Sequence, residues 1–288
     1  MDEAFKKITS HQKQHILIVE KKIKDILKTK NLPLASYFET FLFNGAKRLR
    51  PLFIFLISGL LNFEIDNDVY NLAASVELLH SASLIHDDIL DDARLRRGLI
   101  PLHIEKGNKI AVLAGDFLLS SAMKLISKIN NRNVLKILAD TASEMTTSEI
   151  NSLLMRGKKI PVKKYIEISK GKTSSLFKGA VSALYVLKNR CIDLNIKDFT
   201  ENFSLIFQIK DDLNNFLKAD KNKLSNDLLS EISTLPLILG AENSSDYNII
   251  EKARKFINKR IEKTELFLKE YNSIYKEDLI LLLNLFKG

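Results

Sequence analysis

The sequence predicts an all-α protein, and three observations carry that prediction. Glycine and proline are scarce, 10 and 5 in a chain of 288 residues, so long stretches run without a helix breaker. Apolar residues recur every three to four positions, which is typical of helices with one buried face. Alternating strand patterns are not evident. No linker divides the chain, and we expect a single domain over residues 1–288, a large helical bundle around a deep central cavity.

The helical period can be followed from one end of the chain to the other. Its longest uninterrupted stretch, Val69–Leu90, contains neither Gly nor Pro. Together the periodic segments predict about ten helices. In chain order the segments are Ile16–Leu27, Val69–Leu90, Lys109–Ile129, Val134–Leu154, Val162–Leu187, Ile196–Leu217, Leu235–Leu239, Ile249–Tyr271 and Leu279–Phe286.

Sequence features of membrane insertion and secretion are missing. The longest apolar run, 51–63, is shorter than the ~20 residues that cross a bilayer as a helix. The first residues mix charged and polar side chains and lack the apolar block of a secretory signal. We therefore expect no transmembrane segment and a cytoplasmic location. The single cysteine, Cys191, excludes an intrachain disulfide framework and a thiolate metal cluster.

The formal net charge of +9 is compatible with a nucleic acid, an anionic membrane surface or an anionic small substrate. Most lysines have Glu or Asp nearby, as in K-E-Y-N-S-I-Y-K-E-D. No basic run is interleaved with aromatic residues, the pattern that favours nucleic-acid binding. We therefore expect no nucleic-acid partner, and a solvated lysine-rich surface accounts for most of the charge.

A first acidic motif, H-D-D-I-L-D-D-A-R-L-R-R-G, occupies residues 86–98. Asp87 and Asp91 lie one turn apart on one helix face, which we interpret as mid-helix among apolar neighbours. Like charges at that spacing destabilise a helix, so a compensating cation is expected. Carboxylates without His or Cys partners suit Mg²⁺, which takes one or two carboxylates together with phosphate oxygens. The alternative is an acidic end of a solvated helix.

A second acidic pair, Asp211 and Asp212, lies in F-Q-I-K-D-D-L-N-N-F. Asn215 follows one turn later, and Gln208 precedes Asp211 by nearly one turn. Alone this pair is a weak signal. Two such helices in one chain favour a facing arrangement in which several Mg²⁺ ions hold one diphosphate.

Positive charge gathers at three further places, which suit a second diphosphate. Arg offers a planar fork that matches phosphate oxygens, whereas Lys acts as a point charge. The first place could instead be a basic loop before a buried helix, and His80 alone is more easily explained as a core histidine. The positions are Lys47, Arg48 and Arg50, then Arg96 and Arg97, and His80 two turns before Asp87.

Six segments, in their order and spacing, resemble the trans-polyprenyl diphosphate synthase family over nearly the whole chain. A lone D-D-x-x-D would be a weak pointer, but six ordered motifs make coincidence very improbable. The resemblance implies a fold of the isoprenoid synthase type. The segments are G-A-K-R-L-R-P, E-L-L-H-S-A-S-L-I-H-D-D-I-L-D-D-A-R-L-R-R-G, A-G-D-F-L-L-S-S-A, S-K-G-K-T-S-S-L-F, F-Q-I-K-D-D-L and T-L-P-L-I-L.

The resemblance also implies roles for individual residues. Mg²⁺ ions that bridge the allylic diphosphate would be bound by Asp87, Asp91 and Asp211, with Asp88 and Asp212 in support. Arg96 would bind the same diphosphate. Isopentenyl diphosphate, which binds without metal, would be held by Lys47, Arg50, His80 and Arg97. Near the scissile bond, the developing charges would be stabilised by Lys172, Thr173 and Gln208.

The implied reaction is a head-to-tail condensation of isopentenyl diphosphate with an allylic diphosphate. Mg²⁺ would neutralise the leaving diphosphate, so that the allylic C–O bond ionises and the isopentenyl double bond attacks the carbocation. A proton would then leave, to the departing pyrophosphate, and a dry cavity would protect the cation from water. No organic cofactor is implied, and the resemblance adds a homodimer.

Product length can be argued from the helix that carries the first motif. Ala82 and Ser83 lie one turn before Asp87, where a growing chain would descend into the core. Because both are small, we expect products longer than fifteen carbons. Leu119 or Met123 could close the tunnel deeper down instead.

The chain departs from the family pattern only in its C-terminal half. Asn215 replaces a third Asp, Glu231 and Ile232 replace a glycine and a lysine, S-E-I-N-S replaces G-E-x-x-Q, and the loop 218–227 is short. The alternative to an active enzyme is therefore a catalytically weak or regulatory subunit of a heteromeric synthase. A Mg²⁺-dependent terpene cyclase is disfavoured, because it needs no second diphosphate site. The preferred primer, the exact product and the pathway are not encoded in any motif that we can interpret.

Overall fold

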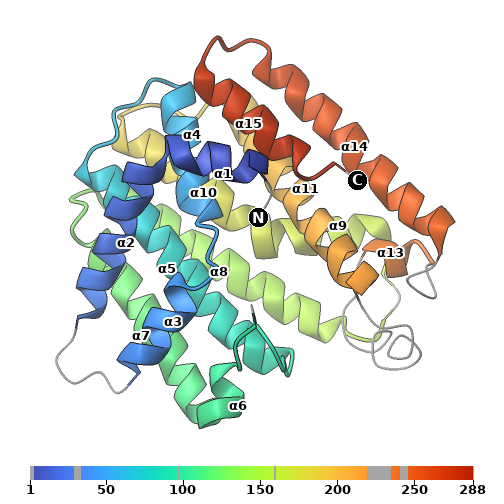
Figure 1. Cartoon of the computed structure of the whole chain (residues 1–288), viewed down its shortest axis with the longest axis horizontal. Coiled ribbons are helices and arrows are strands. Elements are labelled where there is room, and N and C mark those ends of the chain that lie inside the picture. The colour runs from blue at the N-terminus through green and yellow to red at the C-terminus, as the bar shows by residue number, and fades with distance from the viewer. Residues whose placement is uncertain are drawn as a thin grey trace. The chain divides into compact units, whose positions relative to one another are not determined.

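The computed structural model describes residues 3–28, 34–96, 98–158, 160–218, 235–240 and 246–287. Throughout those ranges the regular elements are helices (Figure 1), and the exception is an isolated antiparallel bridge between Arg96 and Leu99. The all-α prediction is confirmed. Two compact units can be distinguished, and each is described separately. The single domain over 1–288 stays a prediction.

The first unit, called here the N-terminal unit, comprises residues 9–137 and 183–190. Its central feature is the packing of α5 on α7, with α2 and α4 also against α5. The apolar run noted in the sequence is α4, in which every residue except Arg50 is buried. The helices that lie wholly within the unit are α2 (Lys13–Leu27), α3 (Ala35–Phe43), α4 (Leu49–Leu60), α5 (Asn67–Leu90), α6 (Leu102–Lys106) and α7 (Asn108–Ile126).

The second unit, called here the C-terminal unit, comprises residues 1–8, 138–182 and 191–288. Here α11 is central, because α9, the π-helical segment η1, α13 and α14 all pack against it. Its elements are α9 (Val162–Ser169), η1 (Lys170–Ser174), α11 (Leu194–Lys218), α13 (Leu235–Ile238), α14 (Tyr247–Leu268) and α15 (Ile274–Asn284). Both units contribute residues to α1 (Glu3–His11), α8 (Arg132–Leu154) and α10 (Ser175–Leu187).

Most predicted helices are found within a few residues of their expected bounds. The expected helix Val162–Leu187 is the main correction, because it is α9, the wider η1 turn and α10 in succession. The expected helix Lys109–Ile129 ends at Ile126. Four helices were not predicted: α1, α3 and α6 are short, and α4 is buried on all sides and so lacks a helical period.

Candidate active site

The first acidic motif lies at the C-terminal end of α5. Asp87 is in the last turn, and Asp91 follows the helix with its N–H donated to the Asp87 carbonyl over 2.9 Å. The expected mid-helix position is therefore wrong. The negative end of the helix dipole adds to the repulsion between the two carboxylates, so this position favours a bound cation more strongly than a mid-helix one would.

Asp88 lies deeper than its neighbour and binds a cation of the chain itself. Its side chain is 2% exposed and accepts a hydrogen bond from Nε of Arg96. The Ala93 N–H is donated to the Asp88 carbonyl over 3.0 Å, and paired backbone bonds of 2.9 Å join Arg96 to Leu99. Burial raises the pKa of Asp88, and Arg96 opposes that shift. Asp88 thus fixes the position of Arg96, while the metal and diphosphate roles of the two remain predictions.

The motif is held in place by a close approach between α5 and α7. A methyl group on Gly115 would lie 2.2 Å from Nε2 of His86, so a larger residue there would displace the imidazole. The same nitrogen lies 3.3 Å from the Val112 carbonyl and 3.4 Å from a carboxylate oxygen of Asp116. This contact explains the A-G-D triplet of the sequence, whose residues position the motif next to α7.

The basic residues around the start of α4 differ in how deeply they are buried. Arg48 is 3% exposed, has a left-handed φ of 51°, and lies 3.1 Å from both Glu20 and Glu77. Its role is therefore structural. Lys47 is exposed and Arg50 is half-buried, as substrate-binding residues would be.

The ion pair between Arg48 and Glu77 also brings two predicted substrate-binding regions together. Glu77 lies on α5 one turn before His80, which is half-buried. The start of α4, with Lys47 and Arg50, is thus attached to the part of α5 that carries His80. Arg97 lies outside the described residues.

The two predicted chain-length residues lie on α5 as expected. Ala82 is 4% exposed, and Ser83 is half-buried and donates its hydroxyl to the His80 carbonyl over 2.9 Å. Both precede Asp87 by about one turn. Their influence on product length stays a prediction.

In the C-terminal unit, the predicted catalytic residues form one hydrogen-bonded chain. Thr173 of η1 donates its hydroxyl to Oε1 of Gln208 over 2.5 Å, and Gln208 donates its amide to Asp212 over 2.8 Å. Tyr165 of α9 donates to the other Asp212 oxygen over 2.6 Å. The family resemblance implied Thr173 and Gln208 near the scissile bond and Asp212 in support of a metal ion. Their side chains lie together, and their roles stay predictions.

Lys172 faces the same place from the wider turn of η1. Its ammonium lies 2.6 Å from Glu149 of α8. Together with Gln208, Asp212 and Tyr165 it lines a small cavity of about 70 Å³. In a regular helix neighbouring side chains point 100° apart, whereas here Lys172 and Thr173 both reach one cluster. The π-helical turn therefore serves the site directly.

The electrostatics of the cluster are dominated by burial. Burial raises the pKa of Asp212 to about 6, against the opposing effect of the hydrogen bonds from Tyr165 and Gln208. The pKa of Tyr165 is also raised well above its ordinary value, first by burial and then by Asp212. The charged form of a desolvated carboxylate that is bonded to neutral donors would be stabilised by a nearby cation.

Asp211, the first acid of this pair, is exposed on the surface of α11. Asn215 donates its amide to an Asp211 oxygen over 3.4 Å. The residue that replaces a third Asp of the family pattern therefore contacts the first acid of its own motif. The departures at Glu231 and Ile232 and most of the short loop 218–227 lie outside the described residues.

Sequence reasoning missed two members of this cluster. Tyr165 looks like an ordinary core aromatic on an amphipathic helix, and nothing in its pattern reveals a bond to Asp212. Glu149 lies in S-E-I-N-S, a segment that departs from the family pattern. An acidic residue at this position, one or two helices from Lys172, was the signal that could have identified the ion pair. Its neighbour Ser148 packs closely against Gly171, because a methyl group on Gly171 would lie 1.8 Å from Oγ of Ser148.

The donor chemistry of both motifs fits Mg²⁺. Within the ranges that the structure describes, no three His, Cys, Asp or Glu side chains are gathered as a ready metal site. What the chain offers instead is pairs of carboxylates. Mg²⁺ suits such an arrangement, because it is usually bound by one or two carboxylates with substrate phosphates and water.

Comparison with known proteins agrees with the motifs. The polyprenyl synthetase profile matches residues 33–274. The chain belongs to the polyprenyl synthetase family. A prenyl transferase from Cyanidium caldarium is 29% identical over 91% of this chain and 84% of its own length. A decaprenyl-diphosphate synthase from Dictyostelium discoideum is 29% identical over 84% of this chain, which spans 57% of that relative.

A comparison of folds finds solved structures with the same all-α architecture. A polyprenyl synthase from Caulobacter crescentus, solved with calcium and isoprenyl diphosphate, superposes with a TM-score of 0.83 at 24% identity, over 98% of this chain and 97% of that one. Membership of this family makes the chain a prenyltransferase. No helix in the described part of the chain is both long and apolar enough to cross a membrane.

Proposed function

We propose that this prenyltransferase condenses isopentenyl diphosphate with an allylic diphosphate, in a Mg²⁺-dependent reaction, to give a trans-polyprenyl diphosphate longer than fifteen carbons. The observation that carries the proposal is the cluster of Lys172, Gln208 and Asp212 around one cavity, with Thr173 bonded to Gln208. Thr173 and Gln208 lie 35 positions apart in sequence, and the convergence of their two helices supports a reaction centre rather than a retained fold.

The chain's own residues account for binding and charge stabilisation. Asp87, Asp91 and Asp211 would hold the metal ions, with Asp88 and Asp212 in support. When bound, Mg²⁺ supplies positive charge that offsets the charge growing on the leaving diphosphate. Lys172 and the hydroxyl of Thr173 would face the scissile bond, and Gln208 keeps that hydroxyl oriented.

The second diphosphate would be bound by cationic side chains without metal. Lys47 and Arg50 lie in a segment that the buried ion pair between Arg48 and Glu77 attaches to α5. Because Arg48 is buried and paired with Glu20 and Glu77 there, its neighbours rather than Arg48 are available for the substrate. His80 and Arg97 would complete this set, and Arg96, positioned by Asp88, would bind the allylic diphosphate.

Product length rests on the small residues of α5 and on the names of relatives. Ala82 is buried one turn before Asp87, and the Dictyostelium relative is named for a decaprenyl product. We expect Ala82→Phe to shorten the main product by at least one five-carbon unit, measured by chromatography of the dephosphorylated products. Leu90→Phe, an exposed position on the same helix, serves as the control. An unchanged product in Ala82→Phe would place the end of the tunnel elsewhere.

The proposed enzyme acts as a cytoplasmic homodimer. Exposed apolar side chains gather on two adjacent helices, α6 and α7, a feature that often marks a protein interface. They are Ile104, Ile110, Val112 and Leu113, between 39% and 63% exposed. Sedimentation of the purified protein checks the oligomeric state, and a monomer would contradict it.

The decisive experiment supplies the purified chain with Mg²⁺, labelled isopentenyl diphosphate and allylic primers of ten, fifteen and twenty carbons. A product of one defined length from the chain alone supports the synthase. A folded chain that makes no product with any primer would contradict it and would favour the regulatory-subunit alternative. The departures at Asn215, Glu231 and Ile232 are the observation that keeps that alternative open.

A further inference from the structure

A second polar pocket lies in the N-terminal unit, among α2, α5 and the end of α7. Its volume is about 290 Å³, near the lower end for small-molecule pockets. Asn67 and Asn71 occupy the first two turns of α5, so Asp87 lies roughly 24 Å further along that helix. The pocket is therefore separate from the acidic motif. Its lining residues are Lys22, Asp25, Ile26, Asn67, Asn71, Leu125 and Lys128.

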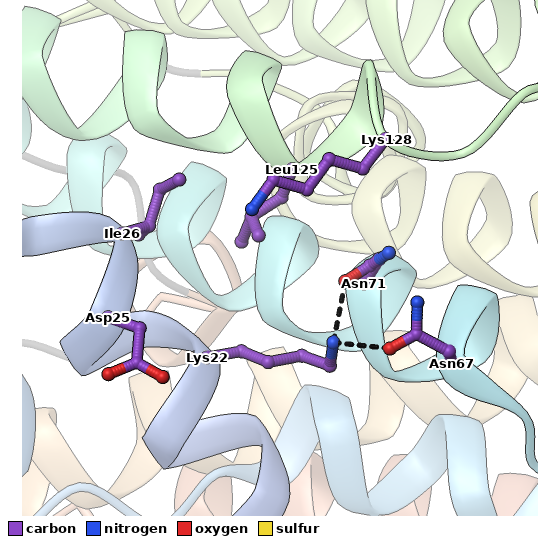
Figure 2. A pocket seen from close by; sticks show the side chains of 7 residues that line it. All are labelled: Lys22, Asp25, Ile26, Asn67, Asn71, Leu125 and Lys128. Carbon is purple, nitrogen blue, oxygen red and sulfur yellow. Dashed lines mark hydrogen bonds between the residues drawn. The ribbon is translucent and has the colours of Figure 1, made fainter.

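Lys22 and the two asparagines form an ordered polar wall. The Lys22 ammonium donates to Oδ1 of Asn67 over 2.7 Å and to Oδ1 of Asn71 over 2.9 Å. Those bonds, dashed in Figure 2, fix both amides so that each NH₂ group remains a donor directed elsewhere. One N–H of the ammonium also remains. The wall thus presents hydrogen-bond donors on a fixed frame.

A second ammonium enters the pocket from another element. Lys128 follows the end of α7, whereas Lys22 comes from α2 (Figure 2). Burial lowers the pKa of Lys22 and the charge of Lys128 lowers it further, whereas the carboxylates of Asp68 and Asp25 oppose that shift. The two ammonium groups therefore repel one another. The acid at the rim, Asp25, is paired with Lys28 over 2.9 Å and is half exposed, which offsets its charge. Two like charges and several donors around a cavity favour an anion.

We propose that this pocket binds a small oxyanion of the phosphate class, held by Lys22 and Lys128 and by the amides of Asn67 and Asn71. Ammonium groups carry donors alone, and both amides are left with NH₂ donors because their oxygens accept from Lys22, which matches an ion that carries acceptors alone. The N-terminus of α5 contributes little, because Asp66 already accepts the N–H groups of Asp68 and Val69. The side chains therefore supply the recognition.

The alternative is a purely structural contact that joins α2 to α5. The two explanations differ over Lys128, because a contact between α2 and α5 does not need a second ammonium from the end of α7. They also differ over the response to added anion, which only a binding site predicts. The proposal is independent of the condensation reaction and is tested without turnover.

The test follows the side-chain amide signals of Asn67 and Asn71 by nuclear magnetic resonance during titration with inorganic phosphate, in metal-free buffer. The signals are assigned from their loss in Asn67→Ala and Asn71→Ala. In the wild-type chain we expect a saturable shift of both. Because charge-assisted hydrogen bonds are lost, Lys22→Met with Lys128→Met should weaken the affinity at least about tenfold. Thermal melting of each variant verifies that it is folded.

A matched control removes the same charge outside the pocket. Lys21→Met with Lys124→Met changes exposed lysines near the same helix ends and should leave the affinity within about twofold of wild type, since only screened long-range charge is lost. Equal weakening in both double variants would overturn the proposal in favour of diffuse surface charge. A wild-type chain without a saturable shift would overturn it as well.

A further arm identifies the source of the phosphate group. The titration is repeated with glycerol 3-phosphate, which carries the same group on a larger molecule. A similar saturable shift indicates a pocket open to phosphate esters, and a shift confined to inorganic phosphate indicates a closed site for the free ion. In either case the shift should be lost in the variant that replaces both Lys22 and Lys128. A shift that survives in that variant would contradict the assignment.

Discussion

The two acidic pairs of this chain share a sequence pattern and differ in how their second acid is held. Asp88 is bonded to a cation, Arg96, eight positions further along the chain. Asp212 is bonded to neutral donors, Tyr165 and Gln208, at a buried position that raises its pKa to about 6. The difference shows that a repeated D-D pattern specifies two carboxylate side chains but not their electrostatic surroundings.

A consequence of this difference concerns where added positive charge is needed. In the N-terminal unit Arg96 already offsets one carboxylate, and the unfavourable charge is that of Asp87 and Asp91 at the negative end of α5. In the C-terminal unit the unfavourable charge is that of Asp212 itself, whose pKa is raised by desolvation. The first acids, Asp87 and Asp211, are more accessible than their partners in both units.

The largest expected effect is on turnover, from removal of either first acid. Asp87→Ala should lower kcat/KM at least about a thousandfold, because it removes a metal ligand on which several kcal/mol of charge stabilisation depend. The fold should be retained, since a repulsive pair at a helix end is relieved. Kinetics with saturating Mg²⁺ and a urea unfolding curve measure the two quantities. Asp211→Ala should behave alike, and near-normal turnover in either variant would remove that acid from the metal site.

The second prediction contrasts the stabilities of Asp88→Asn and Asp212→Asn in metal-free protein. Asp88→Asn should lower the free energy of unfolding by about 1–3 kcal/mol, because a buried charge-assisted bond to Arg96 is lost. Asp212→Asn should change it by less than about 1 kcal/mol at pH 7, because it removes a buried charge bonded only to neutral donors. Urea unfolding of both variants decides the matter. Equal losses would mean that the two surroundings are energetically alike.

The pH dependence of the same measurement sharpens the contrast. The folded-state pKa of Asp212, about 6, lies above the ordinary value of about 3.9. Between those values the folded chain binds more protons than the unfolded chain, so this contribution to stability is full below about pH 4 and is lost by about pH 6. Asp212→Asn should abolish that loss. A difference between wild type and variant that is constant from pH 4 to 7 would contradict the raised pKa.

A third prediction concerns Tyr165 as a positioning residue. Tyr165→Phe removes the hydroxyl that fixes Asp212 and should lower kcat about tenfold with a smaller change in KM, at a stability cost of about 1 kcal/mol. Tyr70→Phe is the matched control, because Tyr70 bonds His15 over 2.7 Å in the other unit. It should lose comparable stability and keep kcat. Parallel losses of kcat in both variants would reduce Tyr165 to a structural role.

The smallest expected effect belongs to Asn215. Asn215→Asp replaces a donor to Asp211 with a third carboxylate, so half-maximal activity should need about two- to tenfold less Mg²⁺ if this side chain reaches the metal. Turnover at saturating Mg²⁺ should change little. The measurement is activity against Mg²⁺ concentration, with Asn214→Asp on the same turn as control. An unaltered requirement would place Asn215 outside the metal shell.

Much of the fold could be predicted from the chain's helical period, and the exceptions have physical reasons. α5 combines length with an absence of breakers, and it was found within two residues of its expected start. α4 is buried on nearly every side, so its sequence carries no amphipathic period. The η1 turn was missed because its residues would also fit a regular helix, and tertiary bonds to Glu149 and Gln208 select the wider turn.

The candidate site was predictable where residue type alone determines the chemistry. Carboxylates suited to a hard cation could be identified in this way, whereas Lys172 and Thr173 were implied by the family resemblance. Partners that act through geometry could not: nothing in the sequence pairs Arg96 with Asp88, Arg48 with Glu77, or Tyr165 with Asp212. Such pairs join residues separated by eight to forty-seven positions, and only the fold brings them together.

The η1 turn makes the length of one short segment more important than its composition. A π-helical turn contains an additional residue relative to an α-helix, so deletion of one position in 170–174 would restore regular winding. Because the wider turn absorbs its additional residue, the helix beyond it would keep nearly the same rotation about the axis relative to α9. The change would fall on the turn itself, where Lys172 contacts Glu149 and Thr173 bonds to Gln208. A deletion in this segment should therefore disturb the site more than the packing of the helix that follows.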